Sequence, residues 1–80
     1  MVKLEDVREA LADVGVDGVE PLKNDKLLGS KFCYDLQMDS LDFEDFLVKI
    51  ERMANMYIPQ SAKDIELSVG EFIKICNANE

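Results

Sequence analysis

The sequence predicts an all-α fold, a small four-helix bundle of three main helices and one short helix, with a long loop between the first two main helices. Three segments carry apolar residues at helical spacing, and glycines and prolines separate these segments. The chain has 80 residues and no internal repeat, so we expect residues 1–80 to form a single domain. Amphipathic helices in such a chain bury their apolar faces against one another around one core.

The first helix is expected close to the N-terminus. Its apolar residues recur every three or four positions and therefore share one helical face: Leu4, Val7, Leu11 and Val14. Gly15 comes directly after them and is the residue type that most often ends a helix, because it adopts a left-handed backbone without strain.

The segment from Val16 to Met38 is interpreted as a long loop. It shows no sustained helical repeat, and four residues that interrupt regular structure occur within it: Gly18, Pro21, Asn24 and Gly29. A connection this long in a small domain is normally functional or docked by its own apolar residues. The candidates for such anchors are Leu22, Leu27, Leu28, Phe32 and Leu36.

The second main helix is predicted from Ser40 to about Asn55, with Pro59 just beyond it. Asp39 precedes it and is a preferred N-cap residue, because its carboxylate can accept hydrogen bonds from unpaired N–H groups of the first turn. Ser40 then falls at the first helical position. The residues expected to face the core are Leu41, Phe46, Ile50 and Met53.

A short helix is expected around residues 62–65, and a last main helix follows it. Ser68 and Glu71 form the S-x-x-E pattern of a capping box, in which each side chain bonds the other residue's backbone N–H. The apolar residues after this box share one helical face: Val69, Phe72, Ile73 and Cys76.

The composition excludes several classes of function. The formal net charge is −8, whereas binding to nucleic acid needs clustered Lys and Arg, and anionic membranes are disfavoured for the same reason. The sequence contains no histidine, the usual general base at neutral pH, and a chain this short buries little apolar surface around an active site. We therefore predict no catalytic residues and no enzyme activity, but fast, salt-sensitive encounters with basic protein surfaces.

Two cysteines, Cys33 and Cys76, could form only one disulfide, whereas disulfide-stabilised domains of this size usually have several. We interpret them as reduced thiols, and no Cys-x-x-Cys pattern or histidine indicates a metal site. Residues 1–6 alternate apolar and charged side chains, which is typical of neither a signal peptide nor a membrane span. These features predict a cytoplasmic protein.

Ser40 is the candidate functional residue. A phosphate-linked group on its hydroxyl would place an anion at a helix N-terminus, where the helix dipole and free N–H groups favour negative charge. Serine hydrolysis is not expected, because the chain has no histidine to activate the hydroxyl. Another protein must therefore modify Ser40. Asp42, Glu44 and Asp45 follow it at once and give the helix start a negative face.

Asp39-Ser40-Leu41 resembles the attachment triplet of the acyl carrier protein family, which opens the second helix of a four-helix bundle. The resemblance covers essentially the whole chain. It extends to the Phe-x-x-Asp-Leu spacing at 32–36 and to residues further along: Asp42, Phe46, Ile50, Glu51, Ile58 and Pro59.

The resemblance implies that a phosphopantetheinyl transferase moves 4′-phosphopantetheine from coenzyme A onto Ser40. The thiol of this group then carries acyl intermediates as thioesters to acyl-transferring and synthase enzymes of fatty-acid, polyketide or related synthesis. By similarity, basic docking patches of these partners contact Asp39, Leu41, Asp42, Asp45 and Glu51. Carriers of this family normally work as monomers, and no heptad pattern indicates a coiled-coil dimer.

The sequence also departs from the family pattern. Gln37-Met38 replaces the small pair, often Gly-Ala, that precedes the triplet, and Glu44, Lys49 and Arg52 lie on the expected partner face. Whether the carrier serves fatty-acid synthesis or a specialised pathway stays open.

Two alternatives come from other classes of function. An acidic interaction module would use the same charged helix without a prosthetic group. An EF-hand-like calcium module would use residues 35–46, but this register places Ser40 at the tight-turn glycine and Phe46 at the bidentate glutamate.

Overall fold

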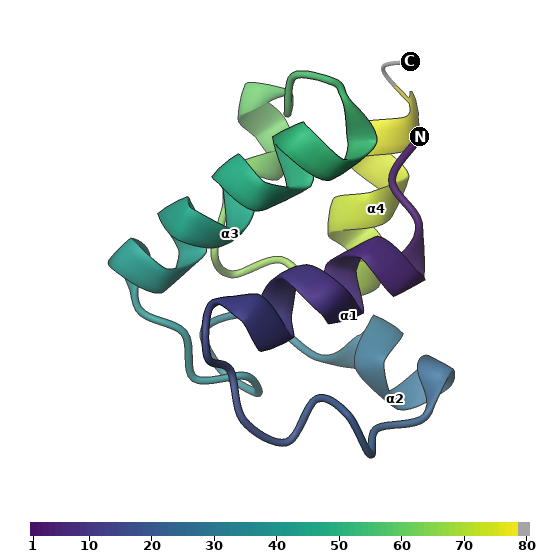
Figure 1. Ribbon diagram of the computed structural model, residues 1–80. Coiled ribbons are helices and arrows are strands. Elements are labelled where there is room, and N and C mark those ends of the chain that lie inside the picture. Colours follow the sequence, from purple (N-terminus) through teal and green to yellow (C-terminus); the bar gives the residue numbers. More distant parts are fainter. Residues whose placement is uncertain (79–80) are drawn as a thin grey trace.

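Four α-helices make up most of residues 1–78, the part of the chain that the computed structural model describes (Figure 1). Their bounds are α1 Leu4–Asp13, α2 Asn24–Gly29, α3 Ser40–Ala54 and α4 Val69–Ala78, with a 3-10 turn at Gln60–Ala62 between α3 and α4. α1 packs against α3, and α2 packs against α4. The predicted all-α class and small helical bundle are confirmed.

The end of α1 confirms the role expected for Gly15. Its φ is +86°, the left-handed conformation that glycine adopts without strain. The N–H of Gly15 donates to the carbonyl of Ala12 at 3.1 Å, and the N–H of Val16 donates to that of Leu11 at 3.0 Å. These two bonds form a Schellman motif, which satisfies carbonyls left unpaired at the helix end.

α2 was not predicted, and the expectation of a long loop without a regular element was wrong in this stretch. The helix has six residues and no side-chain N-cap, and its one buried residue is Leu27. An element this short shows no helical repeat in the sequence. Packing against α4 stabilises it: a Cβ added to Gly70 would lie 3.0 Å from the carbonyl oxygen of Leu28, so the two helices meet closely at this glycine.

Arg8 of α1 holds the start of the long connection. Its guanidinium donates to the carbonyl of Val19 at 2.7 Å and to the side-chain oxygen of Asn24 at 3.0 Å. Both bonds bridge more than ten residues of sequence. They fix the connection to α1, and nothing in the periodicity of the sequence indicated them.

The second half of the connection pairs with the segment before α4. Residues 30–33 and 65–69 exchange three backbone hydrogen bonds of 2.9–3.1 Å, and Lys31 and Ser68 form an isolated antiparallel bridge. Among the predicted anchors, Leu27 and Phe32 are fully buried. The others are less buried: Leu22 and Leu36 are half-buried, and Leu28, at 38% exposed, is no anchor.

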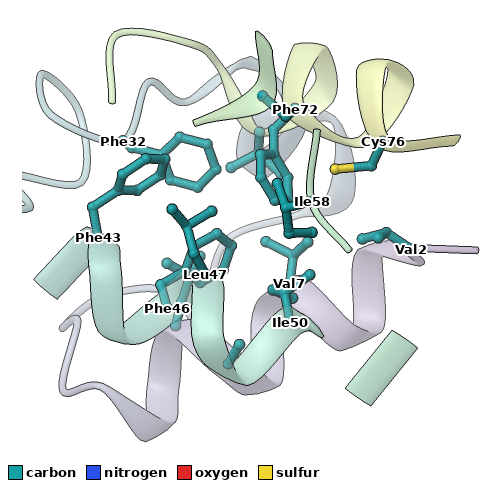
Figure 2. Packing of buried hydrophobic residues seen from close by; sticks show 14 of the residues in the cluster. Val2, Val7, Phe32, Phe43, Phe46, Leu47, Ile50, Ile58, Phe72 and Cys76 are labelled. Atoms are coloured by element: carbon teal, nitrogen blue, oxygen red, sulfur yellow. The ribbon is translucent and has the colours of Figure 1, made fainter. Parts of the chain in front are cut away.

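Four phenylalanines form the centre of the core (Figure 2). Phe32 comes from the connection, Phe43 and Phe46 come from α3, and Phe72 comes from α4. Five pairs of these rings have centroids 5.1–6.0 Å apart, within the range of favourable aromatic contacts. Phe43 comes three residues after Ser40, so the first turn of α3 packs directly on this buried cluster.

The buried face of α3 consists of Phe43, Phe46, Leu47 and Ile50. The prediction for Phe46 and Ile50 is confirmed, and Met53 is half-buried against the core. Leu41 was wrongly assigned to this face, because its side chain is 71% exposed. It lies on the outer side of the helix, seven residues before the exposed Val48.

The short helix expected around residues 62–65 is instead a 3-10 turn at Gln60–Ala62. Pro59 supplies the first acceptor, since its carbonyl receives the N–H of Ala62 at 2.9 Å. Ala62 is fully buried and anchors the turn. Three residues carry too little periodicity to fix such boundaries from sequence.

The capping box that opens α4 is confirmed. The backbone N–H of Ser68 donates to Glu71 Oε1 at 2.9 Å, and the N–H of Glu71 donates to Ser68 Oγ at 3.1 Å. These bonds, above all the one from the Ser68 backbone, lower the pKa of Glu71 below its ordinary value of 4.5. These bonds therefore favour the charged carboxylate form of Glu71 at the helix start.

The two ends of the described chain are held together. The side-chain amide of Asn77 in α4 accepts a hydrogen bond from the Val2 N–H at 2.8 Å and donates one to the Val2 carbonyl at 3.0 Å. These two hydrogen bonds join the N-terminal segment to α4 beside the buried side chain of Val2. Figure 1 shows the N-terminus beside α4.

Candidate functional site

Ser40 is exposed and is the first residue of α3, as predicted. Asp39 has an extended backbone, and its Oδ1 accepts a hydrogen bond from the Asp42 N–H at 2.8 Å, so its role as N-cap is confirmed. The N–H groups of Ser40 and Leu41 point out of the first turn without an intrahelical acceptor, as in any α-helix. A hydroxyl and two backbone donors thus share one exposed helix end.

The residues just before Ser40 hold it in place. Gln37 has a φ of +55°, a left-handed conformation that costs a non-glycine residue about 1 kcal/mol or more. Met38 is buried, and its N–H donates to the Phe32 carbonyl at 3.0 Å. The chain therefore enters the segment before α3 through a left-handed backbone at Gln37.

Three carboxylates surround the start of the helix. Asp42 is half-buried, whereas Glu44 and Asp45 are exposed, and none of the three forms an ion pair within residues 1–78. Asp42 and Asp45 are three residues apart and so lie on the same side of α3. Leu41, which is exposed on this helix start, gives the acidic surface an apolar centre.

Glu51 does not belong to this cluster. It lies about three turns, roughly 16 Å, further along α3 than Ser40. Its side chain is half-buried, and its Oε2 accepts a hydrogen bond from the Ile58 N–H at 3.1 Å. The structure thus brings together Ser40, Asp39, Leu41, Asp42 and Asp45, and gives Glu51 a structural contact in the turn after the helix.

Lys49 forms an ion pair with α1. Its Nζ lies 3.7 Å from Asp13 Oδ2 in a surface ion pair that joins α3 to α1. Arg52, in contrast, is exposed and forms no ion pair or hydrogen bond within residues 1–78. Of the two cations noted on this helix, Arg52 is therefore the one whose charge is available to a partner.

A second surface feature lies at the far end of α3, and sequence reasoning missed it. A groove of about 430 Å³ is lined by Val48, Glu51, Arg52, Asn55, Met56 and Tyr57. Val48 is 48% exposed and Tyr57 is 92% exposed. The i, i+7 spacing of the two exposed apolar residues Leu41 and Val48 was the available sequence signal for an outward apolar stripe.

A third feature is a smaller hollow of about 240 Å³ beside the start of α3. Its acidic residues are Asp17, Asp35 and Asp42. No group of three or more His, Cys, Asp or Glu residues within residues 1–78 is arranged to hold a metal ion.

The calcium-binding alternative does not fit the geometry of residues 35–46. Asp35 Oδ2 accepts the Lys31 N–H at 2.8 Å, and α3 begins at Ser40, halfway through the twelve-residue stretch. Phe46 is fully buried in the aromatic cluster, where a loop of this kind requires a bidentate glutamate.

The two cysteines are free thiols. Cys76 is fully buried in α4, and this burial raises its pKa to about 11. A thiol with so high a pKa is a poor nucleophile at neutral pH. Cys76 is a core residue, and Cys33 is half-buried in the connection.

Within residues 1–78, no helix is both long and apolar enough to cross a membrane. Comparisons of the chain with protein-family models, with curated proteins and with solved structures found no match.

Proposed function

We propose that this chain is an acyl carrier protein whose Ser40 hydroxyl receives 4′-phosphopantetheine. The observation that carries the proposal is the position of Ser40: it is exposed, it is the first residue of α3, and it follows an Asp39 that caps the helix. The small helical bundle and the Asp39-Ser40-Leu41 triplet support the same family resemblance.

The residues around Ser40 fit a phosphodiester at this point. The first-turn N–H groups and the helix dipole favour an anion. Asp39 directs a carboxylate oxygen to the Asp42 N–H, which compensates part of its charge. The buried Met38 and the bond from its N–H to Phe32 keep the hydroxyl outside the core, where another protein can reach it.

The chain's own residues bind and orient, and the partner enzymes supply the chemistry. The sequence offers no histidine to deprotonate Ser40, so a phosphopantetheinyl transferase must activate the hydroxyl. When attached, the group supplies a thiol that holds acyl groups as thioesters. Leu41, Asp42 and Asp45 then form the surface on which basic patches of the transferase and of synthase enzymes dock.

Within this proposal the protein is a cytoplasmic monomer that has no catalytic activity of its own. The acidic carboxylates at the start of α3 form no ion pairs within residues 1–78, so their charge is available to a basic partner. This property supports transient, salt-sensitive docking, which a carrier that visits several enzymes needs.

The test is intact-protein mass spectrometry after incubation with coenzyme A, magnesium and a broad-specificity phosphopantetheinyl transferase. The expected result is a mass gain of one phosphopantetheine group in the wild type and no gain in Ser40→Ala. The alanine variant should retain its helical circular dichroism, because only an exposed hydroxyl is lost. An equal mass gain in both proteins would overturn the assignment to Ser40.

The second candidate is an acidic interaction module without a prosthetic group. The unpaired carboxylates at the start of α3 favour it as much as they favour a carrier, and the two functions differ only at Ser40. Folded wild-type protein that gains no mass with several transferases would favour this alternative over the carrier.

A further inference from the structure

The groove at the C-terminal end of α3 is an open surface with an apolar lining. Its apolar lining residues are Val48, Met56 and Tyr57. Tyr57 is almost fully exposed, and Val48 is about half exposed. Exposed tyrosines beside aliphatic side chains are typical of protein–protein contact sites, where the ring supplies a large apolar area and a polar tip.

Hydrogen bonds within the chain hold the turn that forms the groove. Asn55 has a left-handed backbone with a φ of +52°, and the N–H of Met56 donates to the Glu51 carbonyl at 3.2 Å. The Glu51 carboxylate accepts the Ile58 N–H from the other side of the turn. Because Ile58 is buried in the core, Tyr57 projects from a turn anchored on both of its sides.

Arg52 is the charge that this groove offers to a partner. The positions three and four residues before and after it on the helix are Val48, Lys49, Asn55 and Met56. None of these is acidic, so no neighbour on the helix neutralises the guanidinium, and no described residue pairs with it. The other charge in the groove, that of Glu51, is already hydrogen-bonded to the backbone.

We propose that this groove docks a peptide segment of a partner protein that combines an apolar or aromatic side chain with an adjacent carboxylate. The apolar side chain packs between Val48, Met56 and Tyr57, and the carboxylate pairs with the two-pronged guanidinium of Arg52. The proposal goes beyond the carrier function and does not depend on it, because Ser40 takes no part in the contact.

The two ends of the outer face of α3 therefore attract partner residues of opposite charge. Its first turns present the unpaired acids Asp42 and Asp45, which attract basic residues, and its last turn presents Arg52, which attracts an acid. Along the helix axis, Arg52 lies roughly 15 Å from Asp42 and roughly 10 Å from Asp45. A partner that covers both must carry its basic and acidic residues in that order, so the charge pattern fixes its orientation along α3.

The test is selection of binders from a phage-displayed library of random linear peptides on the 80-residue chain. The strongest peptides are then synthesised, and their affinities are measured by fluorescence anisotropy. We expect them to pair Asp or Glu with an apolar or aromatic residue. Arg52→Gln and Tyr57→Ala should each weaken binding by about tenfold, since each removes one of the two anchors. Arg52→Lys should weaken it less, because the charge remains.

Lys49→Gln is the matched control. It removes one positive charge from the same helix, but on the side that faces Asp13, so binding should change less than about twofold. Ser40→Ala should bind as the wild type does, which separates this contact from the carrier function. Circular dichroism confirms that each variant is folded.

Three results would overturn the proposal. The first is that the selection enriches basic peptides or enriches no peptide. The second is affinity that Arg52→Gln and Tyr57→Ala leave unchanged. The third is a concentration-dependent dimer in sedimentation velocity that Tyr57→Ala abolishes, since a second copy of this chain would then be the occupant.

Discussion

The carboxylate of Glu51 accepts a hydrogen bond from the backbone N–H of Ile58, at 3.1 Å, across the turn that ends α3. The donor belongs to a residue whose side chain is 4% exposed. Glu51 was predicted from the sequence as a partner contact of a carrier. Its geometry gives it a role in the fold, and a partner contact at the same residue would have to use the carboxylate oxygen that remains.

Glu51→Ala should lower the free energy of unfolding by about 1–2 kcal/mol, because a part-buried N–H loses a charged acceptor. Glu51→Gln should cost less, since its amide oxygen can still accept. Urea denaturation followed by circular dichroism measures both. If Gln and Ala destabilise the chain equally, the hydrogen bond is not what makes Glu51 important.

Charge reversal at the start of α3 tests the proposed docking surface. Asp42→Lys and Asp45→Lys should slow phosphopantetheinyl transfer to Ser40 at low salt, and the difference from wild type should shrink at high salt, where charges are screened. Glu5→Lys is the control for Asp42→Lys, because both residues are first-turn acids, Glu5 on α1 and Asp42 on α3. It therefore carries a similar cost from the helix dipole. Equal rates for all the proteins at low salt would remove the docking role.

Replacement of Gln37 by glycine should stabilise the fold. The observed φ of +55° costs a residue with a Cβ about 1–2 kcal/mol, whereas glycine pays only for its freer unfolded chain. We expect Gln37→Gly to raise the free energy of unfolding by about 0.5–1 kcal/mol. Gln37→Ala should leave it nearly unchanged, because alanine keeps the Cβ. A loss of stability in the glycine variant would show that the Gln37 side chain contributes more than its strain costs.

Gly70 and Gly29 provide a matched pair on the two helices that meet. Alanine normally stabilises a helix by about 1 kcal/mol relative to glycine. At Gly29 nothing lies within 4 Å of the added Cβ, so Gly29→Ala should be neutral or stabilising. At Gly70 the Cβ would lie 3.0 Å from the Leu28 carbonyl oxygen, so the backbone of Leu28 must yield by a few tenths of an ångström. We expect Gly70→Ala to lower the melting temperature, and equal gains for both variants would disprove a tight contact between α2 and α4.

The main helices could be predicted because local signals and packing agree in them. Apolar periodicity marked α1, α3 and α4, while Asp39 and the Ser68–Glu71 capping box marked two helix starts. Ser40 was located by the same local rules. α2 and the bonds of Arg8 could not be predicted, since they depend on contacts between residues far apart in the sequence. The groove likewise needs the turn after α3 to fold back against it.

Leu41 was assigned to the core face although its spacing to the core residues of α3 is not helical. Phe46 and Ile50 follow it by five and nine residues, which at 3.6 residues per turn places them roughly 140° and 180° away around the helix. Leu41 therefore lies opposite the buried face, and its side chain is exposed.

Stability at low pH should depend on Glu71. The largest cause of its lowered pKa is the hydrogen bond from the Ser68 backbone N–H, and the second is the hydrogen bond with the Ser68 hydroxyl. A carboxylate with a depressed pKa in the folded state contributes stability that is present above its unfolded pKa, near 4.5. That contribution is lost as the pH falls through the folded pKa.

In Glu71→Gln the amide can occupy the same place in the capping box but does not titrate. The wild type should therefore be more stable than Glu71→Gln at neutral pH, and this difference should shrink in acid. Urea denaturation from about pH 7 to about pH 3 measures the difference. Glu66→Gln is the control, since the Glu66 carboxylate forms no hydrogen bond within residues 1–78. Parallel stability profiles for wild type and Glu71→Gln would mean that the Glu71 charge does not stabilise the start of α4.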